Sequence, residues 1–448
     1  MDSWLRLLEE GGPAPAVIEG DRELTYAELA ASIRATAERC AQEGIGPQSV
    51  VLLHADFSAA GIATLFALIQ LRAILIPMVD LTRNSFETAR TECGAEFLCR
   101  VAPDWTVERL GENAPPALYD TLRARGAAGL VLLSSGSTGR QKAILHDLDR
   151  LLEARAGKTT RRRLSIVLFL LFDHIGGINT LFNSLFSGGK AIVVPERTPE
   201  AVCRLVERHR ANVLPASPTF LNLILMAGFH QRFDLGSLRL ITYGTEPMPE
   251  ELLRRVRKAF PRARLLQTFG TSETGIATTA SELSSSTFFK IEGGDVAYRI
   301  VDGELQLKST TQFLGYLNHR DDAVTADGWF RTGDLVEEAE NGFIRIHGRA
   351  SEVINVGGEK VLPVEVESLL LESPRIADCR VYGERNAITG QIVCADIVPR
   401  EPTTRSELRR HLHELMGGRV DLYKIPSRIN IVDEVARSAR FKKRRTLA

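Results

Sequence analysis

The chain has few cysteines, and none of them stands in a metal-binding pattern. The six are Cys40, Cys93, Cys99, Cys203, Cys379 and Cys394. No pair has C-x-x-C spacing, and no histidine lies at ligand spacing from any of them. Scattered cysteines of this kind are typical of reduced residues in an intracellular protein, so we expect a cytoplasmic location.

The chain also lacks a long hydrophobic run and an excess of either charge. The longest apolar run, Ile166–Phe172, is far shorter than the ~20 residues of a membrane span, and it predicts a buried strand. The first ten residues are amphipathic and acidic, unlike a secretory signal. With 56 basic and 56 acidic residues, the balance argues against nucleic acid or a membrane as the main partner. The basic runs Arg161–Arg163 and Lys442–Arg445 are interpreted as solvated surface.

The length of 448 residues predicts two or three domains, and most of the chain alternates between helix and strand. Strands are predicted at Ser49–Leu53, Ala73–Met78, Gly129–Leu133, Ser165–Leu171 and Ala191–Val194, and helices at Tyr26–Gln42, Ala59–Arg72, Asp147–Gly157 and Gly177–Phe186. This order indicates a parallel sheet covered on both faces. From Gly294 short strands dominate, and a helix is predicted at Pro363–Glu372. We therefore predict an α/β fold: an N-terminal body (1–349) of parallel layered sheets plus a β-rich part, and a small C-terminal α+β lid (350–448).

One loop carries the first sign of chemistry. A strand ending at Leu133 is followed by the small residues Ser134, Ser135, Gly136, Ser137, Thr138 and Gly139, and then by Lys142. Consecutive small residues let backbone N–H groups converge on an anion, so a phosphate tail is the predicted guest. A flexible Ser/Gly turn is the alternative. The loop is not a Walker motif, and Gly157–Thr159 is dismissed as one because Leu152 stands where its first glycine belongs.

Two further turns present a carboxylate each. Gln267–Thr274 places Glu273 after a strand, where it could hold Mg²⁺ together with phosphate oxygens. An exposed capping glutamate is the alternative. Gly328–Leu335 places Asp334 after an aromatic strand, where it could accept hydrogen bonds from a ribose diol. An aspartate satisfying its own turn is the alternative.

Two more segments complete a set of five. Gly348–Glu352 is followed by Ile354 and the Gly357–Glu367 tract, and Arg437–Lys442 forms a basic tail. In this order and at these spacings, the five segments resemble the superfamily of adenylate-forming enzymes, which includes acyl- and aryl-CoA synthetases, peptide-synthetase adenylation domains and luciferase. The resemblance covers nearly the whole chain.

The resemblance implies a role for particular residues. It assigns the ATP phosphates to Ser134–Lys142, and the adenine to Phe269 and to the strand end formed by Tyr243, Gly244, Thr245 and Glu246. Gly270, Thr271 and Ser272 lead to Glu273, the implied Mg²⁺ ligand. Asp334, assisted by Arg349, is implied to hold the ribose. Lys442 is implied to reach the carboxylate and the α-phosphate; Glu273, Ser272 and His174 join it as implied catalytic residues.

The resemblance also implies a two-step reaction. A carboxylate attacks the α-phosphate of ATP and releases pyrophosphate. A mobile lid domain then rotates and admits a thiol, either of CoA or of a carrier protein. ATP, Mg²⁺ and CoA are thus the implied cofactors and co-substrate.

Several positions depart from the family pattern. Ser351 replaces the usual hinge aspartate, Asn355 a lysine, Ala436 a proline and Phe441 the glycine before the catalytic lysine. Lys443 rivals Lys442 for that catalytic position. These changes leave adenylation intact and put the thiol step in doubt.

The acid itself is the least determined part of the prediction. Asp173 and His174, with Tyr243 and Pro215–Phe220, are candidates for the acid pocket. Asp173 could bind a substrate amine or cap the helix that follows it. A small acid is favoured over a long fatty chain. Transfer to a carrier protein or an amine, activation of an amine-bearing aryl acid or of a small inorganic acid such as nitrite, and a non-catalytic nucleotide-binding relative all stay open.

Overall fold

The computed structural model describes residues 3–111, 114–135, 141–157, 163–320 and 322–445. Its contacts group the chain into two compact units. The first unit contains Met1–Pro215, Gly270–Ile276 and Lys308–Phe330, and the second contains Ala216–Phe269, Ala277–Leu307 and Arg331–Ala448. Neither unit coincides with the predicted body or lid, so the boundary at 349/350 stays a prediction.

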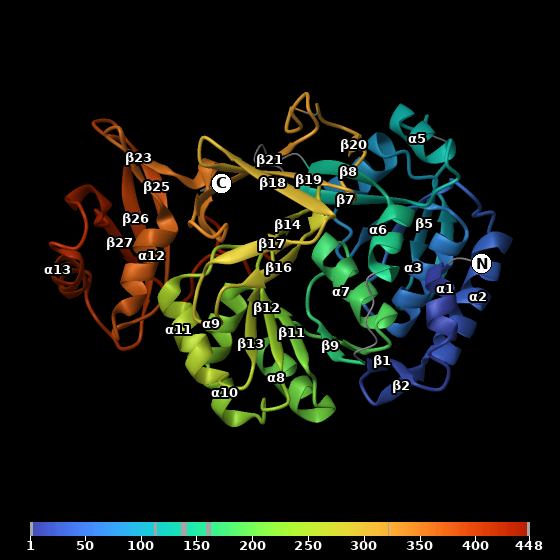
Figure 1. The fold of residues 1–448 in the computed structure, drawn as a ribbon, viewed down its shortest axis with the longest axis horizontal. Coiled ribbons are helices and arrows are strands. Elements are labelled where there is room, and N and C mark those ends of the chain that lie inside the picture. The colour runs from blue at the N-terminus through green and yellow to red at the C-terminus, as the bar shows by residue number, and fades with distance from the viewer. Residues whose placement is uncertain (1–2, 112–113, 136–140, 158–162, 321, 446–448) are drawn as a thin grey trace. The chain divides into compact units, whose positions relative to one another are not determined.

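The first unit is a layered α/β structure (Figure 1). Its helices are α1 Ser3–Glu9, α2 Tyr26–Gln42, α3 Ala59–Gln70, α4 Arg83–Glu87, α5 Asp120–Arg123, α6 Leu148–Ala156, α7 Ile175–Phe186 and α8 Pro199–His209, with short helical turns at Thr88–Glu92 and Ala117–Tyr119. Its strands are β1 Pro15–Glu19, β2 Arg22–Thr25, β3 Val50–His54, β4 Ile74–Met78, β5 Phe97–Arg100, β6 Thr106–Arg109, β7 Gly129–Ser135, β8 Gln141–Asp147, β9 Ser165–Leu168, β10 Lys190–Val193, β11 Val213–Ala216, β14 Gly270–Thr271, β15 Gly275–Ile276 and β20 Gly315–Tyr316.

Two sheets organise this unit. One has the order β20-β8-β7-β4-β3-β5-β6, with β7, β4, β3 and β5 parallel to one another and antiparallel strands at both edges. In the other, β11, β9, β10 and β1 run parallel and β2 is antiparallel to β1. Helix α3 contacts β4 of one sheet and β1 of the other, so helices are packed between the sheets. The predicted parallel sheets are confirmed.

Helix α2 shows how local sequence signals fix an element. Thr25 and Glu28 form a reciprocal capping box at its start, and the helix spans the predicted residues, Tyr26–Gln42. The Tyr26 hydroxyl donates to the carbonyl oxygens of Leu185 and Gly189, each at 2.8 Å. Burial raises the pKa of Tyr26, which keeps this hydroxyl protonated as a donor.

The second unit combines an antiparallel sheet, two parallel strands and a C-terminal α+β part (Figure 1). Its elements are α9 Pro218–Met226, α10 Phe229–Arg232, β12 Leu240–Tyr243, α11 Glu250–Ala259, β13 Arg264–Gln267, β16 Thr278–Ser281, β17 Phe289–Glu292, β18 Val296–Val301, β19 Glu304–Ser309, β21 Phe330–Glu338, β22 Ile344–Arg349, a 3₁₀ turn Ala350–Glu352, β23 Ile354–Val356, β24 Glu359–Val361, α12 Pro363–Glu372, β25 Ile376–Asn386, β26 Gly390–Pro399, α13 Arg405–Met416, a 3₁₀ turn Leu422–Lys424 and β27 Arg428–Ile431. Strands β24-β23-β26-β25, with β27 beside β26, form the C-terminal sheet; α12 packs on β25, and α13 contacts both α12 and β27.

The predicted strand over the apolar run Ile166–Phe172 is too long. Strand β9 ends at Leu168, so the segment is shorter as a strand than its hydrophobicity indicated. The chain turns back over helix α7, where a Cβ on Gly177 would lie 1.9 Å from the Leu171 carbonyl oxygen. This close approach of two backbones ends the extended segment and needs glycine at that position.

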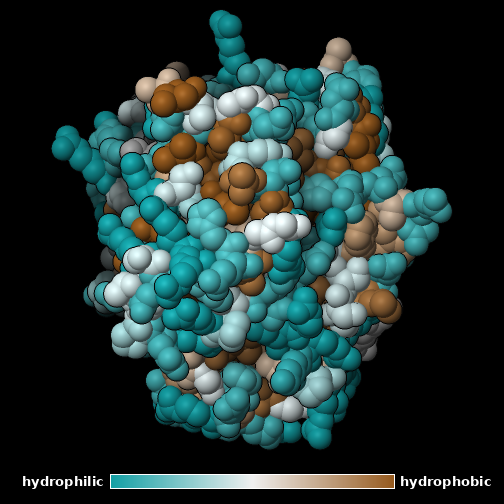
Figure 2. Space-filling view, turned by 90° about the vertical axis from the view of Figure 1, so that its left-hand side faces the viewer, coloured by the Kyte–Doolittle hydropathy of each residue, from teal (hydrophilic) through white to brown (hydrophobic). Residues whose placement is uncertain are grey.

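The face drawn in Figure 2 is mainly hydrophilic, with hydrophobic residues interspersed and gathered mostly in its upper half. Within the C-terminal part, the most exposed large apolar side chains among the described residues are Ile388 at 92% and Leu422 at 79%. Isolated exposed apolar residues of this kind are normal on a protein surface. Among the described residues, every helix is too short or too polar to cross a membrane.

Candidate active site

The predicted phosphate loop joins two paired strands of the first unit. β7 and β8 form an antiparallel hairpin in which Ser134 is opposite Lys142. The loop residues Gly136, Ser137, Thr138 and Gly139 lie outside the described residues, as does the side chain of Ser135. The structure therefore places both ends of the loop, and the role of the loop in phosphate binding stays a prediction.

Glu273 is presented by a tight turn between β14 and β15. The Thr271 hydroxyl accepts hydrogen bonds from the backbone N–H of Glu273 at 3.2 Å and of Thr274 at 3.1 Å. A Cβ on Gly270 would lie 2.3 Å from the Gly275 carbonyl oxygen, so only glycine permits the close pairing. The turn fixes the backbone from which the Glu273 side chain projects, and the Thr271 hydroxyl is already engaged by it.

The Glu273 carboxylate has a side-chain partner that the sequence did not reveal. The Tyr316 hydroxyl donates to Glu273 Oε1 at 2.9 Å. On the ring of the same tyrosine lies the ammonium of Lys142, 4.9 Å from the ring centroid. Tyr316 belongs to β20, which pairs with β8, the strand that carries Lys142. One tyrosine thus links the lysine after the phosphate loop to the predicted metal ligand.

His146 supports the same turn from inside the protein. It is fully buried, and its Nε2 lies 2.6 Å from the Ser272 carbonyl oxygen. A carbonyl only accepts, so Nε2 carries the proton of this hydrogen bond. Burial lowers the pKa of His146 to about 4, which keeps the ring neutral at physiological pH.

The donor set suits a magnesium ion that is shared with phosphate. Within the described ranges, no three His, Cys, Asp or Glu side chains are grouped so as to hold a metal on their own. Mg²⁺ is commonly held by one or two carboxylates plus substrate phosphates, and a single oriented carboxylate such as Glu273 fits that mode. With ATP bound, Glu273 would hold the ion and the phosphates would supply the remaining oxygens.

The structure shows local hydrogen bonds of Asp173 and His174, the two residues predicted for the acid pocket. His174, not Asp173, caps helix α7: its Nδ1 accepts from the Gly176 N–H at 3.3 Å. The capping alternative for Asp173 is therefore wrong. Asp173 Oδ2 instead accepts from the Val79 N–H at 3.3 Å, at the end of β4. Contact of either residue with a substrate stays a prediction.

In the second unit, strand β12 ends in the predicted adenine segment. A Cβ on Gly244 would lie 2.6 Å from the Thr268 carbonyl oxygen, and Thr245 has a left-handed backbone with φ of 73°. Tyr243 is buried, and its hydroxyl lies 3.4 Å from Gln267 Oε1. Phe269 is 7% exposed and packs at 6.0 Å from Phe289. The backbone here is tightly constrained, and the adenine contacts stay predictions.

Asp334 and Arg349 form the pair that the sequence predicted for the ribose. They are opposite each other on β21 and β22, with Arg349 Nε 3.3 Å from Asp334 Oδ1. Asp334 is 8% exposed, and its burial raises the pKa of the carboxyl, although the charges of Arg349 and Lys442 oppose that rise. The carboxylate is thus held beside two cations with little water around it.

Lys442 acts electrostatically on this pair. Packing of protein around its ammonium, together with the charges of Arg440 and Arg349, lowers the pKa of Lys442 to about 8. Glu246 and Asp334 act in the opposite direction. The structure thus brings Lys442, Asp334 and Arg349 together within one unit, as the sequence predicted.

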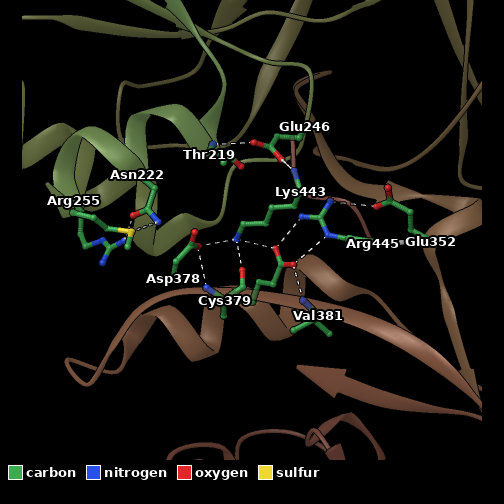
Figure 3. A network of polar contacts seen from close by, with 12 residues as sticks. Thr219, Asn222, Glu246, Arg255, Glu352, Asp378, Cys379, Val381, Lys443 and Arg445 are labelled. Atoms are coloured by element: carbon green, nitrogen blue, oxygen red, sulfur yellow. Dashed lines mark hydrogen bonds and ion pairs between the residues drawn. The ribbon is translucent and has the colours of Figure 1, made fainter. Parts of the chain in front are cut away.

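Lys443, the rival of Lys442, is held by two carboxylates (Figure 3). The Lys443 ammonium lies 3.2 Å from Asp378 and 3.7 Å from Glu367, and its side chain is 7% exposed. Arg445 makes two hydrogen bonds to Glu367, at 3.1 and 2.9 Å, with a side chain that is 4% exposed. The interpretation of this basic run as solvated surface is wrong for both residues. Lys443 is therefore a structural cation, and the catalytic role of Lys442 stays a prediction.

The other departures from the family pattern are accommodated locally. Asn355 Oδ1 accepts from the Gly358 N–H at 2.9 Å and so closes the turn between β23 and β24. Ser351 is exposed in the 3₁₀ turn after β22. Arg161 and Arg162 of the first basic run, and Lys158 and Thr159 of the dismissed Walker-like segment, lie outside the described residues.

The sequence did not reveal three contacts: those of Tyr316 with Glu273, of His146 with the Ser272 carbonyl, and of the Glu246 carboxylate with two backbone N–H groups. Nothing in the spacing of Tyr316 pointed to Glu273, which is 43 positions away. His146 lies in a strand with an apolar pattern, and a lone buried histidine gives no signal in a single sequence. Each of these groups meets its partner only in the folded chain, Tyr316 and His146 in the first unit and Glu246 in the second.

A mixed α/β fold with these groups at the ends of its strands defines the adenylate-forming class of enzymes. The chain belongs to the AMP-binding enzyme family: that family's profile matches residues 8–317, and the profile of the AMP-binding enzyme C-terminal domain matches residues 365–442. The resemblance stated from the sequence is confirmed.

Similar proteins include curated ligases and solved structures. The chain is 29% identical to indoleacetate–CoA ligase of Aromatoleum aromaticum, over 95% of this chain and 92% of that protein. It is 28% identical to 2-succinylbenzoate–CoA ligase of Bacillus licheniformis, over 98% and 97%. Anthranilate CoA ligase AuaEII, solved with anthranoyl-AMP, has a TM-score of 0.81 at 20% identity, over 98% and 95%. Amide bond synthetase McbA from Marinactinospora thermotolerans has a TM-score of 0.80 at 20% identity, over 98% and 96%; both structures share the fold.

Proposed function

We propose that the chain uses ATP to activate a carboxylic acid as an acyl-adenylate and then transfers the acyl group to the thiol of CoA. The observation that carries this proposal is the Asp334–Arg349 pair, 3.3 Å apart across β21 and β22, with which the charge of Lys442 interacts. A cation within electrostatic range of a predicted ribose site suits a reaction at the α-phosphate of ATP.

The chemistry needs charge neutralisation above all. A carboxylate oxygen attacks the α-phosphorus, the bond to the bridging oxygen breaks, and pyrophosphate leaves with the electron pair. Both reactants are anions, so cations must offset their repulsion and the charge that develops in the transition state. With a pKa of about 8, Lys442 is mostly protonated at neutral pH and supplies one such cation. In the second step the thiolate attacks the acyl carbon and AMP leaves.

The first unit contains the charged residues that we assign to the β- and γ-phosphates and to Mg²⁺. We assign the β- and γ-phosphates to the hairpin between Ser134 and Lys142, and Mg²⁺ to Glu273. Bound Mg²⁺ would neutralise phosphate charge. Tyr316 would orient the Glu273 carboxylate, and Lys142 would remain on the face of the Tyr316 ring until phosphate attracts it.

We propose an aromatic acid as the substrate class. Three similar proteins are named for acids of this kind: indoleacetate, 2-succinylbenzoate and anthranilate. The acid pocket assigned to Asp173, His174 and Tyr243 stays a proposal, and an amine-bearing aryl acid remains among the candidates. The predictions of a cytoplasmic location, and of no nucleic-acid or membrane partner, also stay predictions.

A second acceptor is favoured by one observation. Phe441 occupies the place of the family glycine before the catalytic lysine and has a left-handed backbone, φ 52°. This altered loop makes a carrier protein or an amine the rival acceptor. Among similar proteins, one is named pyochelin synthase PchD, from Pseudomonas aeruginosa, at 27% identity over 93% of this chain and 86% of that protein.

The proposal is tested by acid-dependent exchange of labelled pyrophosphate into ATP, across aryl, arylacetic, amino-aryl and short aliphatic acids and nitrite. Each acid that supports exchange is then offered CoA, a pantetheine-loaded carrier protein or an amine, and AMP release is measured. We expect exchange with at least one aryl acid and AMP release that depends on CoA. ATP binding without exchange for any acid would instead support a non-catalytic nucleotide-binding protein.

A further inference from the structure

The C-terminal segment that carries Lys442 is a tight turn. The Phe441 N–H donates to the Ser438 carbonyl oxygen at 2.9 Å, and the Ser438 N–H donates to the Lys442 carbonyl oxygen at 2.9 Å. Arg437 and Lys443 form an isolated antiparallel bridge at the base of the turn. The turn places Phe441, with its left-handed backbone, directly before Lys442. A residue with a Cβ adopts this conformation at a cost in free energy, so contacts elsewhere must offset it.

Helix α9 supplies contacts that offset this cost. The Ser217 hydroxyl donates to the Phe441 carbonyl oxygen at 2.7 Å and accepts from the Phe220 N–H at 3.1 Å as the N-cap of the helix. The Phe441 ring packs edge-on against the Phe220 ring, with centroids 5.0 Å apart and planes at 71°. Backbone and side chain of Phe441 are therefore both held by the first turn of α9.

Glu246 holds the residue on the other side of Lys442 (Figure 3). Its Oε2 accepts from the Lys443 N–H at 3.1 Å, and its Oε1 accepts from the Thr219 N–H at 2.8 Å. Thr219 lies in the first turn of α9, where a carboxylate interacts favourably with the unpaired N–H groups and the helix dipole. One carboxylate thus ties the turn to the start of the helix.

The side chain of Lys443 prevents the turn from shifting along this helix. Its ammonium is held by Asp378 and Glu367 on one side of the chain. Lys442, the neighbouring residue, is within electrostatic reach of Asp334 and Arg349. With the carbonyl of residue 441 and the N–H of residue 443 both fixed, the backbone of Lys442, and hence the direction in which its side chain starts, is set by its two neighbours.

We propose that Glu246, Ser217 and Phe441 form a latch that positions Lys442 for the adenylation step, with Glu246 as its central positioning residue. This inference rests on the proposed function, in which Lys442 acts at the α-phosphate. Ser217 and Glu246 bind backbone groups on either side of Lys442. The latch is defined by these three residues.

The position of Lys442 is measurable without any substrate. Acetic anhydride acylates only neutral amines, so competitive labelling at a series of pH values, read by peptide mass spectrometry, gives the titration midpoint of each lysine. In the unaltered chain we expect Lys442 to titrate near pH 8. Ser217→Ala changes no charge, and we expect the released turn to expose the ammonium to water, so that the midpoint moves up toward the ordinary value of 10.5. Glu246→Ala also releases the turn, but it removes a charge that raises the pKa of Lys442, so its midpoint moves less far. The exposed Lys258 serves as the internal reference.

The variants need matched controls. Glu246→Gln keeps the size of the side chain and one of its two acceptors but removes the same charge as Glu246→Ala, so its midpoint falls below that of Glu246→Ala. Glu372→Gln makes the same change in a glutamate that pairs with Arg419 on the surface, and it leaves the midpoint unaltered. Thermal unfolding shows that each variant is folded before it is labelled.

Pyrophosphate exchange provides the second readout. With an acid that the parent activates, we expect Glu246→Ala to lower kcat for exchange by about tenfold or more while the KM for ATP stays within about twofold. An unmoved Lys442 midpoint in folded Ser217→Ala, which changes no charge, overturns the latch. If the parent activates no acid, the proposed function fails, and the labelling result still decides whether the latch exists.

Discussion

Arg349 Nε lies 3.3 Å from Asp334 Oδ1 across the neighbouring strands β21 and β22. The arginine side chain is 56% exposed, whereas the aspartate side chain is 11% exposed. The carboxylate is therefore fixed inside the protein, and the guanidinium reaches it from the surface. Such a pair fixes the carboxylate for which we propose a hydrogen bond from a ribose hydroxyl.

The first prediction concerns this carboxylate. We expect Asp334→Asn to raise the KM for ATP by about tenfold, because a charged acceptor for a ligand hydroxyl is worth about 1.5–3 kcal/mol. Burial already raises the pKa of Asp334, so neutral asparagine should fold without penalty. The measurement compares ATP with 2′-deoxy-ATP and 3′-deoxy-ATP. The parent should discriminate between them and the variant should not; equal discrimination by both would remove the ribose from the assignment.

Tyr316→Phe tests the link between Glu273 and Lys142. The change removes the hydroxyl that donates to Glu273 and keeps the ring beneath the lysine. We expect exchange to fall about threefold to tenfold, with a higher requirement for free Mg²⁺, because the carboxylate loses one oriented hydrogen bond. Tyr298→Phe is the matched control, since its hydroxyl contacts Glu338 at the surface. An unchanged Mg²⁺ dependence in Tyr316→Phe would contradict the link.

The pH dependence of activity follows from Lys442. Its pKa is lowered to about 8, so the ammonium is charged below that pH and becomes neutral above it. If the charge is needed for adenylation, kcat/KM for exchange should fall as the pH rises through about 8 in the free enzyme. The profile is measured from pH 6 to 10. In Lys442→Arg the fall should disappear from this range, because arginine stays charged.

The buried carboxylate of Glu367 should determine part of the acid stability of the C-terminal part. Burial opposes its ionisation, but the charges of Arg445 and Lys443 outweigh burial and lower the pKa of Glu367. The folded state therefore binds a proton less readily than the unfolded chain. Its stabilising contribution is present above the unfolded carboxyl pKa of about 4.3 and is lost as pH falls through the folded pKa.

Glu367→Gln should remove this contribution. We expect the free energy of unfolding at pH 7 to fall by about 3–5 kcal/mol, because Arg445 and Lys443 lose a buried partner. Urea unfolding at pH 7 and pH 3 checks the prediction. The difference between parent and variant should shrink at pH 3, and Glu372→Gln should match the parent at both pH values. A difference independent of pH would indicate that packing, not charge, is lost.

The sequence predicted elements whose signals are local. Helix α2 begins at the capping box of Thr25 and Glu28, and α12 spans the predicted Pro363–Glu372. The extent of β9 was wrong because hydrophobicity does not record the turn imposed by Gly177. Local rules apply where the partner lies within a few residues, and they fail where a distant backbone decides.

In the candidate site, too, some residues could be predicted from the sequence and others could not. Family order pointed to Asp334, Arg349 and Lys442, and the structure brings these three together. The order of residues gave no means of choosing between Lys442 and Lys443, because the choice depends on Asp378 and Glu367, which are distant in the chain. The role of Glu246 in holding the turn that carries Lys442 could not be predicted from the sequence either, because its partners are two backbone N–H groups.

The account rests most directly on the difference between the two neighbouring lysines. Pyrophosphate exchange and equilibrium ATP binding are measured for the parent, Lys442→Ala and Lys443→Met, with an acid that the parent activates. We predict that Lys442→Ala abolishes exchange and binds ATP within about threefold of the parent, whereas folded Lys443→Met retains exchange with reduced stability. Exchange at the full rate in Lys442→Ala would contradict the central claim.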